Sequence, residues 1–368
     1  MKGYSSVNEA CCLALVSDAF GGHGGIAQYN RDFLRAVAAS ARVASITVLP
    51  RLGPNKAIAP TKVLQQKPHF RRSVYAIAAI WHTLRLRVDI VFCGHLYMAP
   101  LAWLLARLKR AKLIMQMHGI EAWPRPTRLQ RAAVEEADLI LCVSRYTRGA
   151  VLKWADVVPE RVVVVPNTVG EAFTPGVGRS MRESLGIDQR KVLLTVARMD
   201  AGQRYKGHER VIEAIPELVA QGHDILYMVA GEGDDRPRLE ECARKARIAD
   251  RIRFLGAVPP EKMIDCFRIA DLYVMPSTGE GFGIAFIEAM ASGTPALGLA
   301  VAGANDPLAD GELGNVATND QLAQAISHLL AAPRPDPAAL SVRTRARFGG
   351  DAFRERVSMA LDRAQSAA

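Results

Sequence analysis

The 368-residue sequence has little that would hold it together by covalent bonds or by metal. Its six cysteines form no Cys-x-x-Cys pair and no Cys/His spacing suited to zinc, and most of them lie in apolar runs. This pattern argues against a disulfide framework and against a structural zinc site. It predicts a protein of a reducing compartment.

Long apolar runs are also lacking. No window reaches the roughly 18 apolar residues of a spanning helix, and the nearest stretch, 74–108, is interrupted by histidines, arginines and an aspartate. The apolar run at 10–16 is short and only Lys2 precedes it, so we expect no signal peptide. We therefore expect a cytoplasmic protein that is soluble or lies peripherally on the inner face of the plasma membrane.

Aromatic residues make up only 6% of the chain, and no nucleic-acid-binding module is recognisable, so we expect no nucleic-acid partner. Apolar residues at 49% and charged residues at 23% are typical of a globular protein. At this length the chain can bury two cores.

The net charge of +10 is unevenly distributed. Residues 1–170 hold 23 Lys and Arg against 10 Asp and Glu, whereas the remainder holds 24 against 27. Residues 51–112 alone carry 12 basic residues and one acid, Asp89. This partition predicts an anionic partner for the first half.

Short apolar runs alternate with amphipathic segments of helix length, which is typical of parallel sheets covered on both faces. We predict an α/β protein with two Rossmann-like, doubly wound domains facing a cleft: residues 1–170, residues 171–350, and a C-terminal helix at 351–368 that could pack back on the first. The predicted strands are 13–17, 44–49, 90–93, 112–117, 139–143, 161–165, 191–197, 225–230, 251–255, 272–275 and 295–299. The predicted helices include 25–39, 128–136, 209–221, 236–247 and 286–292.

A glycine-rich turn follows the first predicted strand. Gly22, Gly24 and Gly25 would let backbone N–H groups approach a phosphate at a helix N-terminus. A dinucleotide site would also need an acid at the end of the second strand. That strand ends in Pro50-Arg51 with no acid, which argues against a nicotinamide enzyme, although an arginine there could suit a 2′-phosphate.

The most informative stretch is Glu280-Gly-Phe-Gly-Ile-Ala-Phe-Ile-Glu288, with two carboxylates eight residues apart. The glycines allow a tight loop that presents backbone N–H groups near Ile284. Glu288 would lie about one turn into a helix, where it could bind a diol.

This stretch resembles the E-x7-E signature of family 4 retaining glycosyltransferases of the GT-B fold. The resemblance continues, in order, at His118-Gly119, Cys142-Val143-Ser144, Ala197-Arg198-Met199, Tyr205-Lys206-Gly207-His208 and Ala230-Gly231-Glu232-Gly233. The resemblance spans about residues 13–315. Within the family, the sequence is similar to bacterial exopolysaccharide mannosyltransferases.

The resemblance implies roles for individual residues. Arg198 and Lys206 would neutralise the donor diphosphate, and the loop containing Gly22, Gly24 and Gly25 would close over it. Glu288 would bind the ribose, and Glu280 the hydroxyls of the donor sugar.

Four further residues complete the implied site. Phe282, Gly283 and Ile284 would offer backbone N–H groups. His118 would lie beside the donor sugar and the developing oxocarbenium centre. The catalytic set is therefore His118, Arg198, Lys206 and Glu280, with no metal and no cofactor besides the donor.

The implied reaction transfers a hexose from a nucleotide sugar to a saccharide acceptor, which we expect to be lipid-linked, in exopolysaccharide or surface glycan synthesis. GDP-mannose is the first choice of donor. The alternatives are a glycosyltransferase of the same family that uses a UDP-sugar, or a noncatalytic protein that binds a sugar nucleotide. No Asp-x-Asp occurs in the sequence, which agrees with cationic side chains in place of a metal, and Asp234-Asp235 is expected to be solvated.

Two features bear on the acceptor and on the donor loop. Residues 67–72 and 103–112 interleave apolar and basic residues, which favours an anionic membrane surface as a partner of the basic N-domain. Residues 296–303 are apolar where many relatives have polar residues, so the loop that meets the distal end of the donor is expected to differ.

Overall fold

The computed structural model describes residues 9–54, 58–187 and 189–366. Lys2 and residues 55–57 of the basic segment lie outside this described part. The chain forms two compact units. Unit 1 contains the residues up to Asn167 and those from Phe353 onward, and unit 2 is Thr168–Ala352.

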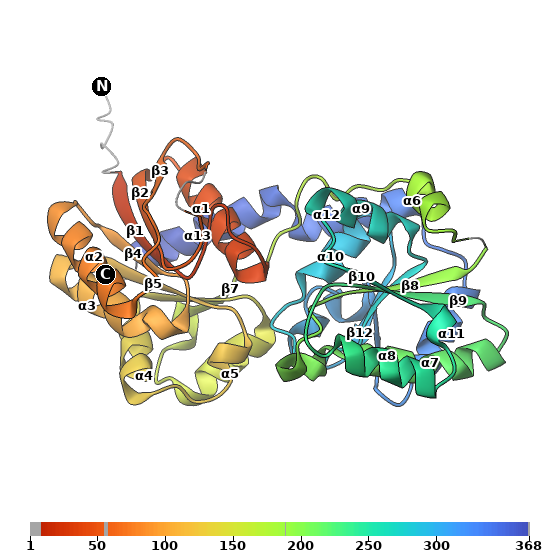
Figure 1. Ribbon diagram of the computed structural model, residues 1–368. Helices are drawn as coiled ribbons and strands as arrows, with labels where there is room; N and C mark the ends of the chain where they lie inside the picture. The colour runs from red at the N-terminus through yellow and green to blue at the C-terminus, as the bar shows by residue number, and fades with distance from the viewer. Residues whose placement is uncertain (1–8, 55–57, 188, 367–368) are drawn as a thin grey trace, which may run out of the picture. The chain divides into compact units, whose positions relative to one another are not determined.

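Unit 1 is built on a seven-stranded sheet in the order β3-β2-β1-β4-β5-β6-β7, in which each neighbouring pair is parallel (Figure 1). Its strands are β1 Ala10–Val16, β2 Val43–Pro50, β3 Val63–Gln65, β4 Ile90–Cys93, β5 Lys112–Met117, β6 Leu139–Cys142 and β7 Val162–Val164. Its helices are α1 Gly25–Ala39, α2 Arg72–Arg85, α3 Ala99–Lys109, α4 Arg128–Glu135, α5 Arg145–Trp154 and most of α13 Gly350–Ser366.

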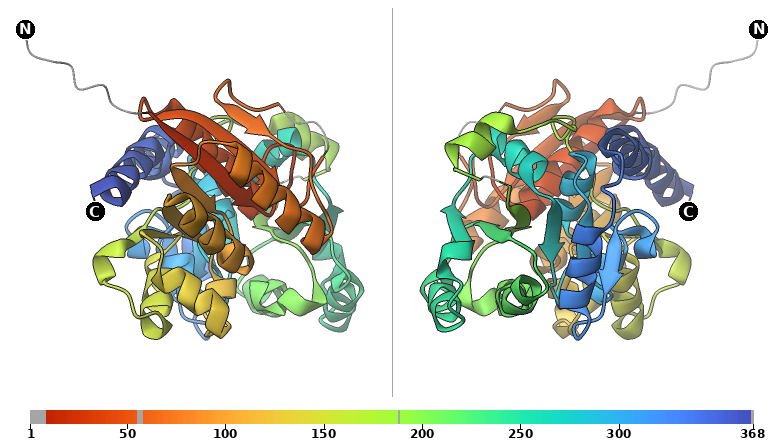
Figure 2. Two further views of the ribbon diagram at one scale, coloured as in Figure 1. Left: turned by 90° about the vertical axis from the view of Figure 1, so that its left-hand side faces the viewer. Right: turned by 90° about the vertical axis from the view of Figure 1, so that its right-hand side faces the viewer.

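Helices cover both faces of this sheet. Side chains of α2 to α5 join one buried cluster with alternate strand residues such as Leu13 and Leu15. On the other face, Phe33 of α1 stacks on Phe92 of β4 with ring centroids 4.3 Å apart. Tyr29 of α1 meets Phe353 of α13 edge-on at 5.9 Å, and both views of Figure 2 show the dark-blue α13 beside the red N-terminal elements.

Unit 2 contains a six-stranded sheet in the order β10-β9-β8-β11-β12-β13, again with parallel pairs. Its strands are β8 Lys191–Val196, β9 Ile225–Ala230, β10 Ile252–Gly256, β11 Leu272–Met275, β12 Ala296–Leu299 and β13 Asn315–Ala317. Its helices are α6 Arg179–Ser184, α7 His208–Ala220, α8 Arg236–Lys245, α9 Pro260–Ile269, α10 Ile284–Ala291, α11 Leu322–Ala331 and α12 Pro337–Phe348.

The second sheet is also covered on both faces. Helices α7, α8 and α11 share a buried cluster with one face, whereas Tyr273 of β11 meets Phe267 of α9 and Phe286 of α10 edge-on from the other. Figure 1 shows α9 and α10 on one side of the sheet and α7, α8 and α11 on the other. The predicted doubly wound α/β architecture is confirmed in both units.

Short 3-10 helices occupy several connections. They are η1 Leu96–Met98, η2 Ile120–Ala122, η3 Pro159–Arg161, η4 Ala201–Lys206, η5 Ala249–Arg251, η6 Ala302–Asn305 and η7 Ala309–Gly311.

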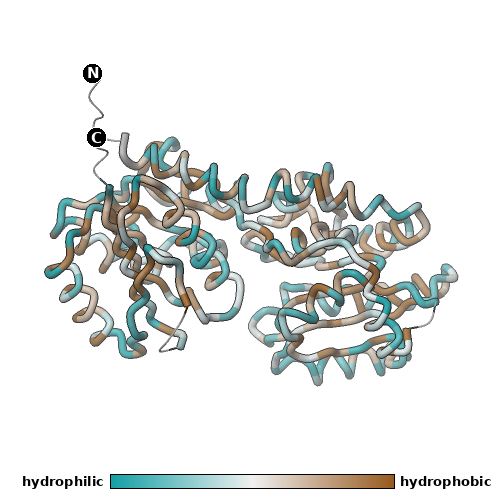
Figure 3. The backbone as a smooth tube through the Cα atoms, turned by 90° about the horizontal axis from the view of Figure 1, so that it is seen from above, coloured by the Kyte–Doolittle hydropathy of each residue, from teal (hydrophilic) through white to brown (hydrophobic). Residues whose placement is uncertain are grey.

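The apolar stretch at 74–108 is divided among α2, β4, η1 and α3. Strands β4 and β9 are buried throughout, whereas hydrophilic and hydrophobic residues alternate along the helical coils (Figure 3). Among the described residues, no helix is both long enough and apolar enough to cross a membrane.

Candidate active site

The predicted site residues of unit 2 gather at one edge of its sheet. Strands β8 and β11 are neighbours, but β8 leads to β9 on one side and β11 leads to β12 on the other. Such a reversal leaves a crevice at the carboxyl ends of the two strands, where doubly wound sheets bind ligands. Arg198 and Lys206 follow β8. Glu280, Phe282, Gly283, Ile284 and Glu288 follow β11.

Lys206 and Glu280 form a direct ion pair at this edge. The Lys206 Nζ lies 2.7 Å from the Glu280 Oε2, and both side chains are largely buried, with exposed fractions of 18% and 12%. The Thr278 N–H donates to the Tyr205 carbonyl at 2.9 Å, which holds the two loops side by side. The pair therefore presents a cation and an anion from loops 74 residues apart.

Arg198 lies on the exposed turn after β8. The neighbouring Met199 N–H donates to the Glu232 carbonyl at 2.8 Å, and the Ala197 N–H donates to the Ala230 carbonyl at 3.0 Å. The loop after β9 therefore fixes the backbone on both sides of Arg198. Burial raises the pKa of Tyr205. The nearby positive charge of Arg198 acts in the opposite direction and lowers it.

Acidic residues hold the Lys206 loop. The expectation that Asp234-Asp235 is solvated is correct for Asp234, which is exposed, and wrong for Asp235, which is buried. Asp235 is 5% exposed and receives hydrogen bonds from Arg238 (2.7 and 2.8 Å) and Arg204 (3.0 Å). The bonds from Arg238 are the main cause of the lowered Asp235 pKa. Asp234 accepts a hydrogen bond from the Ala201 N–H at 2.8 Å. Sequence reasoning missed this support because Arg204 and Arg238 belong to no recognisable motif.

The glycine-rich loop after β11 is anchored by its one large side chain. Phe282 is 3% exposed and meets Phe348 of α12 edge-on at 5.6 Å. Phe282 can therefore offer only its backbone to a ligand. Gly283 immediately precedes α10, and Ile284 is its first residue. The first N–H groups of a helix have no partner within it, so they suit an anionic group or a hydroxyl oxygen.

Glu288 lies in α10, one turn after its start. Buried Tyr273 of β11 lies near both Glu280 and Glu288, which add to the effect of burial in raising the Tyr273 pKa. The two carboxylates of the signature therefore share one region of unit 2.

Residues 296–303, which we expected to form a loop, include a strand and the start of a 3-10 helix. Ala296–Leu299 is the buried strand β12, which explains its apolar character. Gly303 in η6 donates its N–H to the Glu280 carbonyl at 2.9 Å. The segment therefore supports the Glu280 loop through its backbone.

In unit 1, the predicted glycine loop joins β1 to α1. A Cβ added to Gly22 would lie 2.0 Å from the Asp18 Oδ2, so a larger residue there would require the Asp18 side chain to move. Arg31 of α1 donates to the Gly22 carbonyl at 2.6 Å and to the Ala19 carbonyl at 3.0 Å. Gly24 and Gly25 are exposed at the start of α1.

His118 follows β5 at the same carboxyl edge of the unit 1 sheet. Its Nε2 lies 2.9 Å from the Gly94 carbonyl, which can only accept, so Nε2 carries the proton and Nδ1 is the basic atom. The His118 N–H donates to the Glu121 Oε1 at 2.6 Å, and Tyr29 meets the ring edge-on at 5.3 Å. Burial lowers the His118 pKa, so the ring is neutral at pH 7.

Sequence reasoning missed His95, which follows β4 at this edge. Its ring centroid lies 6.1 Å from that of His118, and its Nδ1 accepts a hydrogen bond from the Tyr97 N–H at 3.3 Å. Burial lowers the His95 pKa to about 4. The available signal was its position after a central strand, next to the β1/β4 reversal.

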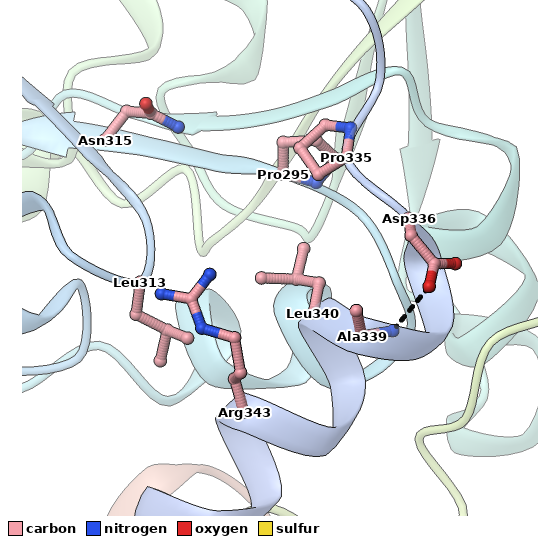
Figure 4. A pocket seen from close by; sticks show the side chains of 8 residues that line it. All are labelled: Pro295, Leu313, Asn315, Pro335, Asp336, Ala339, Leu340 and Arg343. Atoms are coloured by element: carbon pink, nitrogen blue, oxygen red, sulfur yellow. Dashed lines mark hydrogen bonds between the residues drawn. The ribbon is translucent and has the colours of Figure 1, made fainter.

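One pocket in unit 2 lies away from these residues. Figure 4 shows that α12 contributes Leu340 and Arg343 to its lining. Pro295 precedes β12 and Asn315 begins β13, so this pocket is at the amino ends of the strands. It is at the opposite edge of the sheet from the Lys206–Glu280 pair and carries none of the predicted site residues.

Comparisons with known proteins show the family of the chain. Residues 23–172 match the family model described as Glycosyltransferase Family 4, and residues 179–347 match the model described as Glycosyl transferases group 1. The D-inositol 3-phosphate glycosyltransferase 2 of Catenulispora acidiphila is 31% identical over 293 residues, which cover 72% of this chain and 68% of that protein.

Another relative is the GDP-mannose-dependent alpha-(1-6)-phosphatidylinositol monomannoside mannosyltransferase of Mycolicibacterium smegmatis. It is 29% identical over 255 residues, covering 64% of this chain and 66% of that protein. The D-inositol 3-phosphate glycosyltransferase of Corynebacterium diphtheriae is 29% identical over 297 residues, covering 74% and 67%. The chain thus spans about two thirds of the length of these relatives.

Solved structures share the fold at low identity. Anabaena HepE in complex with UDP-glucose has a TM-score of 0.79 at 17% identity, covering 96% of this chain and 100% of that one. WaaG, a glycosyltransferase involved in lipopolysaccharide biosynthesis, has a TM-score of 0.62 at 20% identity, covering 95% and 98%. Together with the two family models and the Catenulispora relative, these findings establish that the chain belongs to glycosyltransferase family 4 and is a transferase enzyme with the GT-B fold.

Proposed function

We propose that this enzyme transfers a hexose from a nucleoside diphosphate sugar to a saccharide acceptor with retention of configuration. The observation that carries the proposal is the Lys206–Glu280 pair, 2.7 Å apart at the β8/β11 reversal, with Arg198 on the adjacent turn. In the proposed complex the diphosphate replaces Glu280 as the ionic partner of the Lys206 ammonium. Glu280 then accepts hydrogen bonds from the sugar hydroxyls.

The other site residues fit the same donor. Glu288 in α10 accepts hydrogen bonds from the ribose diol, and the backbone N–H groups of Gly283 and Ile284 bind hydroxyls or phosphate at the helix start. In unit 1, neutral His118 offers Nδ1 to a sugar hydroxyl, and the loop of Gly22, Gly24 and Gly25 contributes N–H groups to the diphosphate.

The reaction breaks the bond between the anomeric carbon and the diphosphate oxygen and forms one to the acceptor oxygen. Fixed cations stabilise the charge that develops on the leaving diphosphate, and Lys206 and Arg198 supply them without a metal. The acceptor proton goes to the leaving phosphate on the same face of the sugar. We favour this course over double displacement, which needs a carboxylate free to attack the anomeric carbon.

For the donor we propose GDP-mannose, with a UDP-sugar as the second candidate. The mannosyltransferase of Mycolicibacterium smegmatis is described as GDP-mannose-dependent, whereas Anabaena HepE was solved with UDP-glucose. For the acceptor we propose a lipid-linked saccharide of exopolysaccharide or surface glycan synthesis.

A donor panel tests the proposal. GDP-mannose and UDP-glucose are each incubated with the enzyme and lipid-linked acceptors, and released GDP or UDP is measured. Release of GDP supports the first choice, and release of UDP supports the second. Donor binding without turnover by either nucleotide sugar would contradict transfer and favour a noncatalytic binding protein.

Two variants test the residues. Lys206→Ala should lower turnover by about 100-fold or more, since removing one group that stabilises developing charge costs that much. Glu288→Ala removes the proposed contact with the ribose diol, so it should raise the KM for the donor. The matched control is Lys191→Ala, an exposed lysine at the amino end of β8 that lies 3.6 Å from Asp271. Near-normal turnover in Lys206→Ala, with circular dichroism unchanged, would refute the assignment.

A further inference from the structure

The pocket at the amino edge of the unit 2 sheet contains none of the residues of the proposed reaction. It encloses about 230 Å³ between helix α12 and the amino ends of β12 and β13 (Figure 4). Its wall is largely apolar, since Pro295 is buried, Leu340 is 5% exposed and Leu313 is half-buried. Sites for drug-sized ligands are larger, at about 300–1,000 Å³. This hollow, here called the amino-edge pocket, therefore fits a small molecule with an apolar body.

One cation faces the apolar wall. Figure 4 shows the Arg343 guanidinium beside Leu313. A terminal nitrogen of this guanidinium donates to the Glu312 carbonyl, which is its one hydrogen bond within the described chain. The bond holds the guanidinium in place and leaves its other N–H groups for a ligand. A carboxylate can bind such a fork through both oxygens.

The acids near the amino-edge pocket are engaged elsewhere. Asp336 accepts hydrogen bonds from two backbone N–H groups in the first turn of α12, at 3.1 and 3.2 Å, and so caps that helix (Figure 4). Glu312 lies 3.9 Å from Arg347, one turn further along α12 than Arg343. Among the described residues, Arg343 has no ion-pair partner. The pocket therefore favours an anionic ligand over a cationic one.

Helix α12 connects the amino-edge pocket with the loop that carries Glu280. The Ser341 hydroxyl donates to the carbonyl of Ala291, the last residue of α10, at 2.6 Å. Phe348, the last residue of α12, meets Phe282 of the glycine-rich loop edge-on at 5.6 Å. A ligand in the pocket would therefore touch the helix that supports both α10 and this loop.

We propose that the amino-edge pocket is an effector site for a small carboxylate with an apolar body. The carboxylate binds Arg343, and the apolar body lies against Leu340, Leu313 and Pro295. Pairing the guanidinium and burying apolar area stabilise α12 in its present position. Because α12 supports the donor loop, the effector and the nucleotide sugar favour the same arrangement of unit 2, so each tightens the binding of the other. The site is independent of the proposed function, whereas its effect on the donor rests on it.

Binding to the site is tested without a donor. The full chain is titrated with 4-fluorobenzoate, and with 4-fluorobenzyl alcohol as the neutral analogue, by fluorine NMR. We expect the carboxylate to bind at least about tenfold more tightly than the alcohol, because hydrogen bonds to a charged group contribute about 1.5–3 kcal/mol. Arg343→Gln should remove this preference. The control Arg244→Gln, on α8 at 69% exposure, should bind the probe like wild type.

Donor affinity then measures the coupling. UDP-glucose and GDP-mannose are titrated with and without saturating 4-fluorobenzoate, and we expect the Kd of the donor that binds to fall by about fivefold or more. Phe348→Leu, which shortens the contact with Phe282, should bind the probe like wild type and lose this gain. Hydrogen exchange is a readout that needs no donor, because the probe should slow exchange in α12 and α10.

The possible failures are distinguishable. If neither nucleotide sugar binds but the probe slows exchange in α12 and α10, the proposed function fails and the site stands. Absence of probe binding, equal binding of acid and alcohol, or wild-type binding by a folded Arg343→Gln variant would overturn the site. An unchanged donor Kd together with unchanged exchange in α10 would overturn its role as an effector site.

Discussion

At the scale of single residues, the enzyme holds its candidate groups by burial and by close ion pairs. The Lys206 Nζ forms an ion pair with the Glu280 Oε2 at 2.7 Å. Asp235 accepts hydrogen bonds from Arg204 and Arg238. His208, two residues after Lys206, is 4% exposed, and its Nε2 has no hydrogen-bond partner in the described structure. Burial lowers its pKa to about 4.

His208 therefore makes stability depend on pH. The unfolded chain binds this proton near pH 6.5 and the folded chain only near pH 4, so lowering the pH through this window favours unfolding. We expect His208 to account for about 3 kcal/mol of the stability lost between pH 8 and pH 4. Urea unfolding of wild type and His208→Gln across this range measures it, with pH 8 as the baseline. Parallel curves for the two proteins would contradict the prediction.

At the scale of elements, the connections after the central strands decide the geometry of the site. Gly207 joins η4 to α7 with a φ of 85°, and a Cβ added to it would lie 2.3 Å from the Pro276 carbonyl oxygen. The junction therefore needs glycine for its backbone conformation and for the close approach of the chain after β11.

Gly207→Ala should destabilise the protein and displace Lys206. The comparison is Gly222→Ala, with a φ of 91° and no heavy atom within 4 Å of the added Cβ. Left-handed strain costs each variant about 1–2 kcal/mol, and the clash should cost Gly207→Ala roughly 1–3 kcal/mol more. Chemical denaturation gives both values, and donor turnover should fall only in Gly207→Ala. Equal destabilisation of the two variants would show that the carbonyl approach is unimportant.

At the scale of the whole molecule, the chain passes from one unit to the other twice, after Asn167 and after Ala352. Phe348 and Phe353 lie on either side of the second crossing, and each is 2% exposed. Phe348 packs on Phe282 in unit 2, whereas Phe353 packs on Tyr29 in unit 1.

Truncating these two rings should therefore weaken different units. Phe353→Ala and Phe348→Ala should each cost about 3–5 kcal/mol. Hydrogen exchange should show faster exchange in α1 for Phe353→Ala and in α10 for Phe348→Ala. If either variant loosened both helices equally, the two units would not be separate packing units.

Much of the fold could be predicted because each buried parallel strand corresponds to a short run of apolar residues in the sequence. The expected segments 90–93, 112–117, 225–230 and 272–275 coincide with strands of the structure. Strands β3 and β13 were not predicted, since three residues are too few for a periodic signal. The helix at 25–39 was predicted, whereas α2 and α3 were hidden in the apolar stretch 74–108.

The sequence by itself determined the family and the doubly wound α/β class, because a glycine-rich signature and apolar periodicity are local properties of a chain. Only the tertiary structure decided that Lys206 meets Glu280, that Phe282 is an anchor, and that His95 lies near His118. It also decided which apolar residues of α2 face outward. These are contacts and exposures between segments far apart in the chain, and they exist only once parallel strands bring their carboxyl ends to a common edge.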